Sequence, residues 1–305
     1  MSLKTVIIIT GPTASGKTEL AMELARHFQT SIISADSRQC FRELNIGVAK
    51  PSREQLGEIK HAFINSHSIS EDVNAAVFET LAMVFCDDVF ETRDVVVMCG
   101  GTGLYIKAFR DGLDEIPIVD ESIRKKIQSS FKDNGLDWLK ESIRISDPLF
   151  YASGEMANPQ RIMRALEVVQ STGLSIISFR NRQKKQRPFR ILEFGISLPR
   201  KELYKRINHR VDIMMDQGLL DEVVSLLPNQ HLNALQTVGY SELFGYLQGK
   251  TRLQESIAMI KQNTRHYAKR QITWMNKIEN LVWLETDFLN KIISYYQNPK
   301  VSFQR

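Results

Sequence analysis

A glycine-rich segment near the start of the chain has the residue types and spacing of a phosphate-binding loop. It follows the pattern Gly-x-x-x-x-Gly-Lys-Thr and reads Gly11-Pro12-Thr13-Ala14-Ser15-Gly16-Lys17-Thr18. Glycines let successive backbone N–H groups turn towards phosphate oxygens, Lys17 adds a positive charge, and the Thr18 hydroxyl is a ligand for Mg²⁺. We predict that this loop holds the diphosphate of a small-molecule donor during group transfer, with Mg²⁺ as cofactor.

Asp36 is the candidate acid-base residue, because it ends a second apolar run, residues 31–35, and so lies at the same edge of the sheet as the loop. A carboxylate there can accept a proton from a nucleophile or bind magnesium. Its alternative role is to cap a following helix. A hydrolytic NTPase normally has another apolar strand ending in aspartate, whereas residues 95–98 lead into Cys99-Gly100-Gly101. The sequence therefore argues against nucleotide hydrolysis.

Apolar runs that alternate with glycine turns and helical periodicity predict a doubly wound α/β core. Thr5–Thr10 is β-branched and has no polar alternation, as expected for a strand buried on both faces of a parallel sheet. A helix is expected at residues 19–28, and another after Gly100-Gly101-Thr102-Gly103. Further strands are expected at residues 31–35, 95–98, 191–198 and 281–284. Ligands bind such sheets at the carboxyl ends of the strands, where Thr102 lies.

The pattern changes after residue 112 to short helices and polar connections that are interrupted by four prolines, at positions 117, 148, 159 and 188. We expect residues 113–190 to form a mainly helical insertion outside the sheet. Residues 1–112 and 191–305 are then expected to form the P-loop core with its flanking helices.

Composition is typical of a globular protein with a modest excess of positive charge. The 305 residues are 43% hydrophobic, with 40 Lys and Arg against 35 Asp and Glu. The three cysteines, Cys40, Cys86 and Cys99, lack a Cys-x-x-Cys spacing, which argues against a disulfide framework or a zinc site. No signal peptide and no apolar stretch of the roughly 20 residues that a membrane helix needs is recognisable. We expect a soluble cytoplasmic protein.

Three basic segments are candidates for nucleic-acid binding. Arg161 and Arg164 are three residues apart on one helix face, residues 180–190 contain six basic residues, and residues 263–274 combine cations with aromatic rings. Cations neutralise phosphates, and rings stack on unpaired bases. Each segment alone is also typical of a solvated helix face, so the residues leave both interpretations open.

Together these motifs resemble the tRNA dimethylallyltransferases, also called tRNA isopentenyl transferases, over nearly the whole chain. Besides the glycine-rich loop, the matching segments are Asp36-Ser37-Arg38-Gln39, Ile46-Gly47-Val48-Ala49-Lys50-Pro51, Gly100-Gly101-Thr102-Gly103-Leu104-Tyr105, Pro159-Gln160-Arg161, Val238-Gly239-Tyr240 and Thr264-Arg265-His266-Tyr267-Ala268-Lys269-Arg270-Gln271-Ile272-Thr273-Trp274. The resemblance implies transfer of a dimethylallyl group from dimethylallyl diphosphate to N6 of the adenosine next to the anticodon, position 37, in tRNAs that read codons beginning with U.

The resemblance also implies roles for single residues. Asp36 corresponds to the general base, Thr18 to a Mg²⁺ ligand, and Arg210 to an arginine that reaches the diphosphate. Thr102 corresponds to a residue that contacts the target nucleotide, and Gln39 to one that binds the target base. The full set of implied tRNA contacts is Asp36, Ser37, Arg38, Gln39, Thr102, Arg124, Gln160, Arg161, Ile162, Met163, Arg164, Tyr240, Lys269, Arg270, Gln271 and Trp274. The partners are the tRNA anticodon stem-loop and the donor, and a monomer is expected.

The sequence departs from the family pattern at three positions, none of them in the loop or at Asp36. Val48 replaces a threonine, Phe41 a tyrosine, and Ala62 a second histidine. Three alternatives stay open: a P-loop kinase of small molecules, a prenyltransferase of free adenine nucleotides, and a non-catalytic RNA-binding protein.

Overall fold

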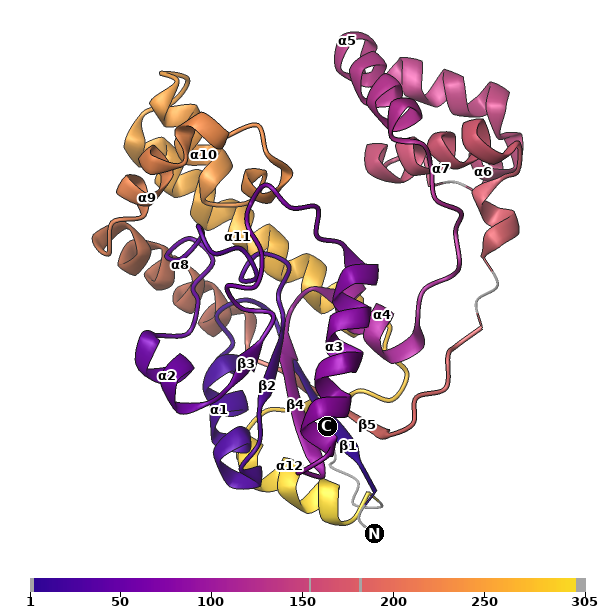
Figure 1. Cartoon of the computed structure of the whole chain (residues 1–305). Coiled ribbons are helices and arrows are strands. Elements are labelled where there is room, and N and C mark those ends of the chain that lie inside the picture. Colours follow the sequence, from indigo (N-terminus) through magenta and orange to yellow (C-terminus); the bar gives the residue numbers. More distant parts are fainter. Residues whose placement is uncertain (1–2, 154, 181–182, 300–305) are drawn as a thin grey trace. The chain divides into compact units, whose positions relative to one another are not determined.

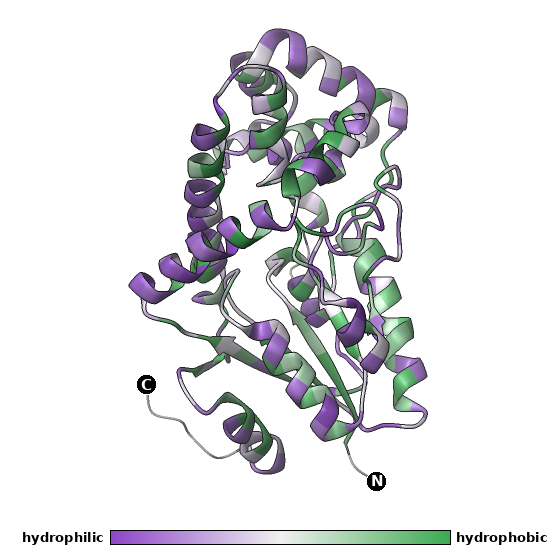
Figure 2. Cartoon of the chain, turned by 90° about the vertical axis from the view of Figure 1, so that its left-hand side faces the viewer, coloured by the Kyte–Doolittle hydropathy of each residue, from purple (hydrophilic) through white to green (hydrophobic). Residues whose placement is uncertain are grey.

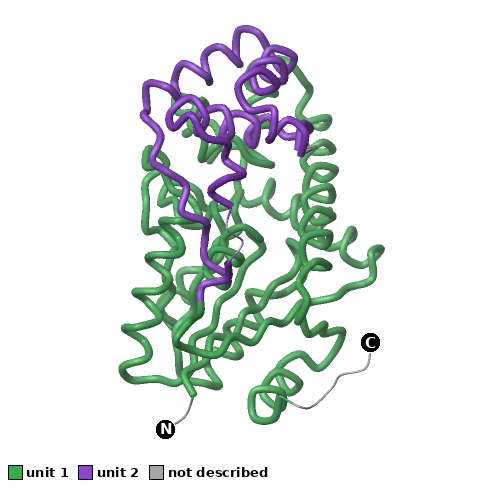
Figure 3. Tube along the Cα trace, turned by 90° about the vertical axis from the view of Figure 1, so that its right-hand side faces the viewer, with its two compact units in different colours: residues 1–110, 186–305 green, residues 111–185 purple. Residues whose placement is uncertain are grey.

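A computed structural model describes residues 3–153, 155–180 and 183–299. The chain forms two compact units: Met1–Arg110 with Gln186–Arg305, and Asp111–Lys185 (Figure 3). The second unit ends five residues before the predicted boundary at 190, because Arg187 is fixed within the first unit. Its guanidinium donates to Glu79 at 2.7 Å and to the carbonyl oxygens of Ala108 at 2.8 Å and Phe109 at 2.7 Å.

The two segments that connect the units are each fixed by specific contacts. Arg110 pairs with the largely buried Glu193, at 2.9 Å, on the first unit. The backbone N–H of Lys185 donates to the carbonyl oxygen of Asp111 at 2.8 Å. The second unit therefore begins and ends at neighbouring points of its own backbone.

The first unit is built on a six-stranded parallel sheet, which confirms the predicted α/β fold. The strand order is β3-β2-β4-β1-β5-β6, and every pair is parallel. The strands are β1 Thr5–Thr10, β2 Ile32–Ala35, β3 His61–Ala62, β4 Val95–Gly100, β5 Arg190–Ile196 and β6 Val282–Leu284. β1 and β4 are buried along their whole length, and most of their residues are hydrophobic (Figure 2).

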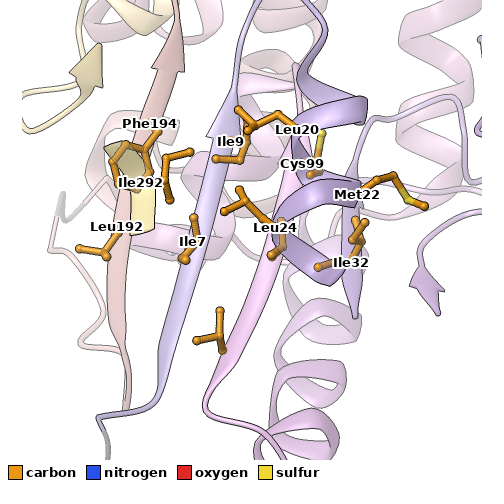
Figure 4. Close-up of a cluster of buried hydrophobic side chains, with 14 of the residues drawn as sticks. Ile7, Ile9, Leu20, Met22, Leu24, Ile32, Cys99, Leu192, Phe194 and Ile292 are labelled. Atoms are coloured by element: carbon orange, nitrogen blue, oxygen red, sulfur yellow. The ribbon is translucent and has the colours of Figure 1, made fainter. Parts of the chain in front are cut away.

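Helices cover both faces of this sheet (Figure 1). The helices of the first unit are α1 Lys17–Phe28, α2 Arg53–Glu58, α3 Ala75–Phe90, α4 Gly103–Asp111, α8 Arg200–Asp216, α9 Leu219–Ser225, α10 Tyr240–Leu247, α11 Leu253–Met275 and α12 Phe288–Gln297. Leu20 and Leu24 of α1 pack against Ile7 and Ile9 of β1 (Figure 4), and Ile292 of α12 joins the same core. This packing fixes the start of α1, and with it the glycine-rich loop.

The second unit is mainly helical, as expected of the insertion. It contains α5 Glu121–Ser146, α6 Pro148–Ala152 and α7 Pro159–Thr172. Gly135, at φ 73°, interrupts α5. A separate apolar core, which includes Ile127, Leu139 and Leu166, holds these helices together. None of the helices in the described part of the chain is long and apolar enough to span a membrane.

Gly100 allows the end of β4 to lie close to the end of β2. Replacing Gly100 tests whether this close approach is needed for the stability of the sheet. A Cβ atom there would lie 2.2 Å from the carbonyl oxygen of Ala35. We expect Gly100→Ala to lower the free energy of unfolding by about 1–3 kcal/mol through overpacking, measured by denaturant titration. The control is Gly57→Ala in α2, where a Cβ meets nothing within 4 Å. Equal stability of the Gly100→Ala protein and the unchanged protein would contradict this account.

Candidate active site

The candidate site lies where the carboxyl ends of β1, β2 and β4 meet. The glycine-rich loop follows β1, Asp36 follows β2, and Gly101 and Thr102 follow β4. A cavity of about 80 Å³ opens there. It is lined by Thr13, Lys17, Thr18, Ala21, Ile32, Ser34, Asp36, Gln39, Val48, Pro51, His61, Ile64, Cys99, Gly100, Arg210, Tyr267 and Gln271. The loop and Asp36 therefore share one space, as the strand positions predict.

The glycine-rich loop has the bent backbone of an anion-binding turn. Ala14 and Gly16 have φ angles of 63° and 88°, and Gly16 precedes the first residue of α1. The positive end of the α1 dipole therefore points at the loop. The Ser15 hydroxyl is buried and has no hydrogen-bond partner among the described residues.

Lys17 is half-buried beside this loop. Its Nζ donates to the carbonyl oxygen of Pro12 at 3.2 Å. Burial lowers the pKa of Lys17, the charge of Arg210 lowers it further, and Asp36 opposes this change. A bound anion would stabilise the ammonium that burial disfavours.

Arg210 of α8 brings a second cation to the cavity. In the described part of the chain, its guanidinium has no hydrogen-bond acceptor and no carboxylate within ion-pair distance. Burial lowers the pKa of Arg210, and the nearby Asp36 opposes this effect. A desolvated charge without a partner is costly, so Arg210 is placed to receive an anionic ligand.

Asp36 has one engaged and one available carboxylate oxygen. Oδ1 accepts from the backbone N–H of Arg38 at 2.9 Å. Oδ2 has no hydrogen bond within the described residues. Asp36 does not cap a helix, because the next helix, α2, begins at Arg53 and has Ser52 as its N-cap. The carboxylate is left to face the cavity.

A second cavity, of about 220 Å³, adjoins the first. Thr13, Asp36, Val48, Arg210 and Tyr267 line both. Ser37 and Arg38 line only the second one. Asp36 therefore lies at the junction of the cavity that is lined by the phosphate loop and a second, larger cavity.

Gln271 and Trp274 join α11 to the site. The Gln271 side chain is buried, accepts from the N–H of Thr13 at 2.8 Å and donates to the carbonyl oxygen of Gly101 at 3.0 Å. The Trp274 ring covers Gly103, where a Cβ would lie 2.4 Å from it. Both ends of the Gln271 amide are engaged, which gives this residue a positioning role, and its predicted tRNA contact stays a prediction.

Thr102 and Gln39 join the ends of neighbouring strands. The Thr102 Oγ1 accepts from the N–H of Ser37 at 3.0 Å, and its side chain also bonds Tyr267. Gln39 accepts from Ser34 at 2.9 Å and donates to the carbonyl oxygens of residues 48 and 49. The Gln39 amide nitrogen thus helps to hold residues 48 and 49, and the predicted contact of Gln39 with the target base stays a prediction.

Three of the predicted tRNA contacts are buried hydrophobic or aromatic side chains. Ile162 and Met163 are 0% and 5% exposed within the core of the second unit. Tyr240 is 0% exposed, and its hydroxyl donates to Glu222. These three side chains are enclosed by their own unit, and the predicted contacts of the three residues with tRNA stay predictions.

The remaining basic candidates are accessible. On the second unit Gln160 and Arg161 are exposed, while Arg124 and Arg164 both pair with the buried Glu167, at 3.6 and 3.3 Å. On α11 of the first unit, Lys269 and Arg270 are exposed. Within the basic segment 180–190, Arg182 lies outside the described residues.

The IPP transferase family model matches residues 39–278 of this chain. Two curated relatives match over nearly the whole length. The tRNA dimethylallyltransferase of Christiangramia forsetii is 44% identical over 297 residues, covering 97% of this chain and 98% of that protein. The tRNA dimethylallyltransferase 1 of Bacteroides thetaiotaomicron is 44% identical over 293 residues, covering 96% and 95%.

Solved structures agree with this result. The tRNA isopentenylpyrophosphate transferase of Bacillus halodurans matches with a TM-score of 0.69 and 33% identity, over 96% of this chain and 95% of that one. A eukaryotic dimethylallyltransferase acting on tRNA matches with a TM-score of 0.78 and 25% identity, over 97% and 76%. Because the family model covers well over half of the sequence and these relatives match almost all of it, the chain belongs to the IPP transferase family.

Proposed function

We propose that this chain transfers the dimethylallyl group of dimethylallyl diphosphate to N6 of the adenosine next to the anticodon of tRNA. The observation that carries the proposal is the placement of Asp36 between two cavities, one of which also contains Lys17, Thr18 and Arg210. The relatives named as tRNA dimethylallyltransferases support the same substrates. We also propose that the chain is a monomer and acts in the cytoplasm.

The reaction is a substitution at the allylic carbon of the donor. The lone pair of N6 attacks this carbon, the bond from the carbon to the diphosphate oxygen breaks, and its electron pair leaves with the diphosphate. Lys17, Arg210 and the N–H groups of the loop stabilise the charge that develops on this leaving group. Asp36 Oδ2, the free carboxylate oxygen, accepts the proton that N6 loses.

Mg²⁺ fits the oxygen groups of this cavity. Magnesium is usually held by one or two protein oxygens together with substrate phosphates and waters, and the Thr18 hydroxyl lies in the same cavity as the phosphate loop. When bound, the ion would neutralise part of the charge on the diphosphate. We assign Thr18 as its protein ligand and keep Asp36 for proton transfer.

The tRNA surface is proposed to include accessible cations of both units. These are Arg124, Arg161 and Arg164 on the insertion, and Lys269 and Arg270 on α11. Their contacts with phosphates would offset the few kcal/mol needed to draw the adenine out of its stacked loop.

The substrates are tested by incubating the protein with radiolabelled dimethylallyl diphosphate, Mg²⁺ and either unmodified tRNA or AMP. We expect label on tRNA without added ATP, because no step requires it. Label only on AMP would identify a prenyltransferase of free nucleotides. Transfer of a phosphate from ATP to a small molecule, with no prenylation, would identify a kinase.

The role of Asp36 is tested by Asp36→Asn, which keeps the shape of the side chain and removes the base. Single-turnover transfer should fall by roughly 10²-fold or more, while the dissociation constants of donor and tRNA stay nearly unchanged. Asp221→Asn, an exposed change on α9, is the matched control. A rate within a few-fold of the unchanged protein would remove Asp36 from catalysis.

The role of Thr18 is tested by comparing Thr18→Val with Thr18→Ser over a magnesium titration. The valine variant lacks the hydroxyl, so half-maximal transfer should need several-fold more Mg²⁺, whereas the serine variant should resemble the unchanged protein. Chelation of Mg²⁺ should abolish transfer by all three proteins. Identical titrations for the valine and serine variants would exclude Thr18 as a ligand.

A further inference from the structure

The 45–51 loop forms one wall of the proposed donor cavity. Val48 and Pro51 line this cavity together with Lys17 and Thr18. The loop contains no helix or strand, and Ala49 has a φ of 47°. Its position therefore depends on contacts from outside the loop.

Glu222 of α9 supplies three of these contacts. Its Oε2 accepts from the backbone N–H groups of Asn45 at 3.1 Å and Ile46 at 2.7 Å. Its Oε1 accepts from the N–H of Gly47 at 3.1 Å and from the Tyr240 hydroxyl at 2.6 Å. Four donors converge on one carboxylate, and hydrogen bonds to an ionised acceptor are about twice as strong as neutral ones.

Tyr240 completes this arrangement from α10. Its ring packs on Gly47, where a Cβ atom would lie 2.6 Å from the ring. Burial, with the adjacent Glu222 charge, raises the pKa of Tyr240, so its hydroxyl stays protonated and donates. Glu222 accepts hydrogen bonds from three backbone N–H groups of the loop. We use the name loop clamp for Glu222, Tyr240 and these three N–H groups.

The opposite side of the loop is held by different groups. The Gln39 Nε2 donates to the carbonyl oxygens of Val48 at 3.2 Å and Ala49 at 3.0 Å. The Lys50 Nζ donates to the carbonyl oxygen of Phe41 and to Asn65 Oδ1, both at 2.6 Å. Because both the N–H and the C=O groups of the loop are engaged, Val48 is held in one place.

The cavity lining includes apolar residues besides Val48, among them Ile32, Pro51 and Ile64. Ile32 and Ser34 of β2, and Asp36 just after it, are two residues apart and share the face that lines the cavity. At about 3.3 Å per residue, Ile32 lies roughly 13 Å along the strand from Asp36. Ile64 and Pro51 complete the apolar end. The whole cavity, including the part lined by Lys17 and Thr18, has a volume of about 80 Å³, so its apolar end is small.

We propose that Glu222 and Tyr240 are positioning residues that set the chain length of the prenyl donor by fixing Val48 and Pro51 against the apolar end of the cavity. This inference rests on the proposed function. With the loop clamp intact, the cavity takes a branched five-carbon chain and rejects a ten-carbon chain. A weakened clamp releases the loop and admits the longer donor.

The test compares dimethylallyl diphosphate with geranyl diphosphate, its ten-carbon analogue, in tRNA prenylation by three variants. Tyr240→Phe removes one hydrogen bond and keeps the ring on Gly47. Glu222→Gln replaces one carboxylate oxygen by an NH₂ group, which cannot accept hydrogen bonds from the backbone N–H groups of the loop. Val48→Ala enlarges the cavity directly and leaves the loop clamp unchanged. Asp221→Asn, next to Glu222 on the exposed side of α9, removes a charge without touching the loop.

We expect the kcat/KM for geranyl diphosphate, relative to that for dimethylallyl diphosphate, to rise about tenfold in Glu222→Gln and Val48→Ala and less in Tyr240→Phe. The KM for dimethylallyl diphosphate should rise in Glu222→Gln while the dissociation constant for tRNA stays constant. Asp221→Asn should match the unchanged protein in both respects.

Several outcomes would overturn the inference. Lower thermal stability with an unchanged donor ratio would make the loop clamp purely structural. A gain in Val48→Ala alone would place length selection in Val48 without the clamp. If Glu222→Gln does not fold, an unchanged donor ratio in Tyr240→Phe decides against the clamp. Failure of the unchanged protein to prenylate tRNA from either donor would instead refute the proposed function.

Discussion

Two half-buried cations without carboxylate partners determine what this site can hold. Among the described residues, neither Lys17 nor Arg210 has an acid within ion-pair distance, and burial lowers the pKa of both. Asp36 opposes part of this effect on both pKa values, and a bound anion would stabilise the two positive charges further. The strand order brings the two cations together, because β1 ends at the glycine-rich loop and α8 follows the neighbouring β5. The cavity is therefore complementary to a diphosphate before any substrate arrives.

The lining of the same cavity contains one carboxylate, that of Asp36. Where a hydrolytic NTPase has an acid at the end of the strand beside β1, this chain has Cys99, whose Sγ donates to the carbonyl oxygen of Lys17 at 3.4 Å. Burial raises the pKa of Cys99 to about 11, so the thiol stays neutral. Asp36 is thus the acidic side chain among the residues that line the cavity. A lone base beside a diphosphate site suits a substitution that releases diphosphate and one proton.

Much of this arrangement could be predicted from the sequence, because local signals carry it. The β-branched run and the glycine-rich segment after it predict β1 and the phosphate loop. The end of the next apolar run predicts the position of Asp36. β3 was missed because two residues, His61 and Ala62, carry no periodicity. The helical periodicity of α7 could have separated the buried Ile162 and Met163 from the exposed Arg161.

Long-range contacts account for the other differences. Gln271 lies 258 residues from its partner Thr13, and Glu222 lies 175 residues from Gly47. No local pattern distinguishes a glutamine that holds a loop from one that contacts RNA. Tyr240 illustrates this point, since the motif Val238-Gly239-Tyr240 is visible in the sequence but the hydrogen bond from the Tyr240 hydroxyl to Glu222 is not.

The chain crossings of the insertion have an evolutionary consequence. Asp111 and Lys185 are joined by a backbone hydrogen bond, and just beyond them Arg110 and Arg187 are fixed in the first unit by Glu193 and Glu79. An inserted segment whose two ends lie side by side adds little conformational entropy cost to the folding of the first unit, and this cost grows only slowly with the length of the segment. Such a site tolerates lengthening, shortening or replacement of what it carries. The sequence and length of the insertion can therefore diverge while the parallel sheet stays the same.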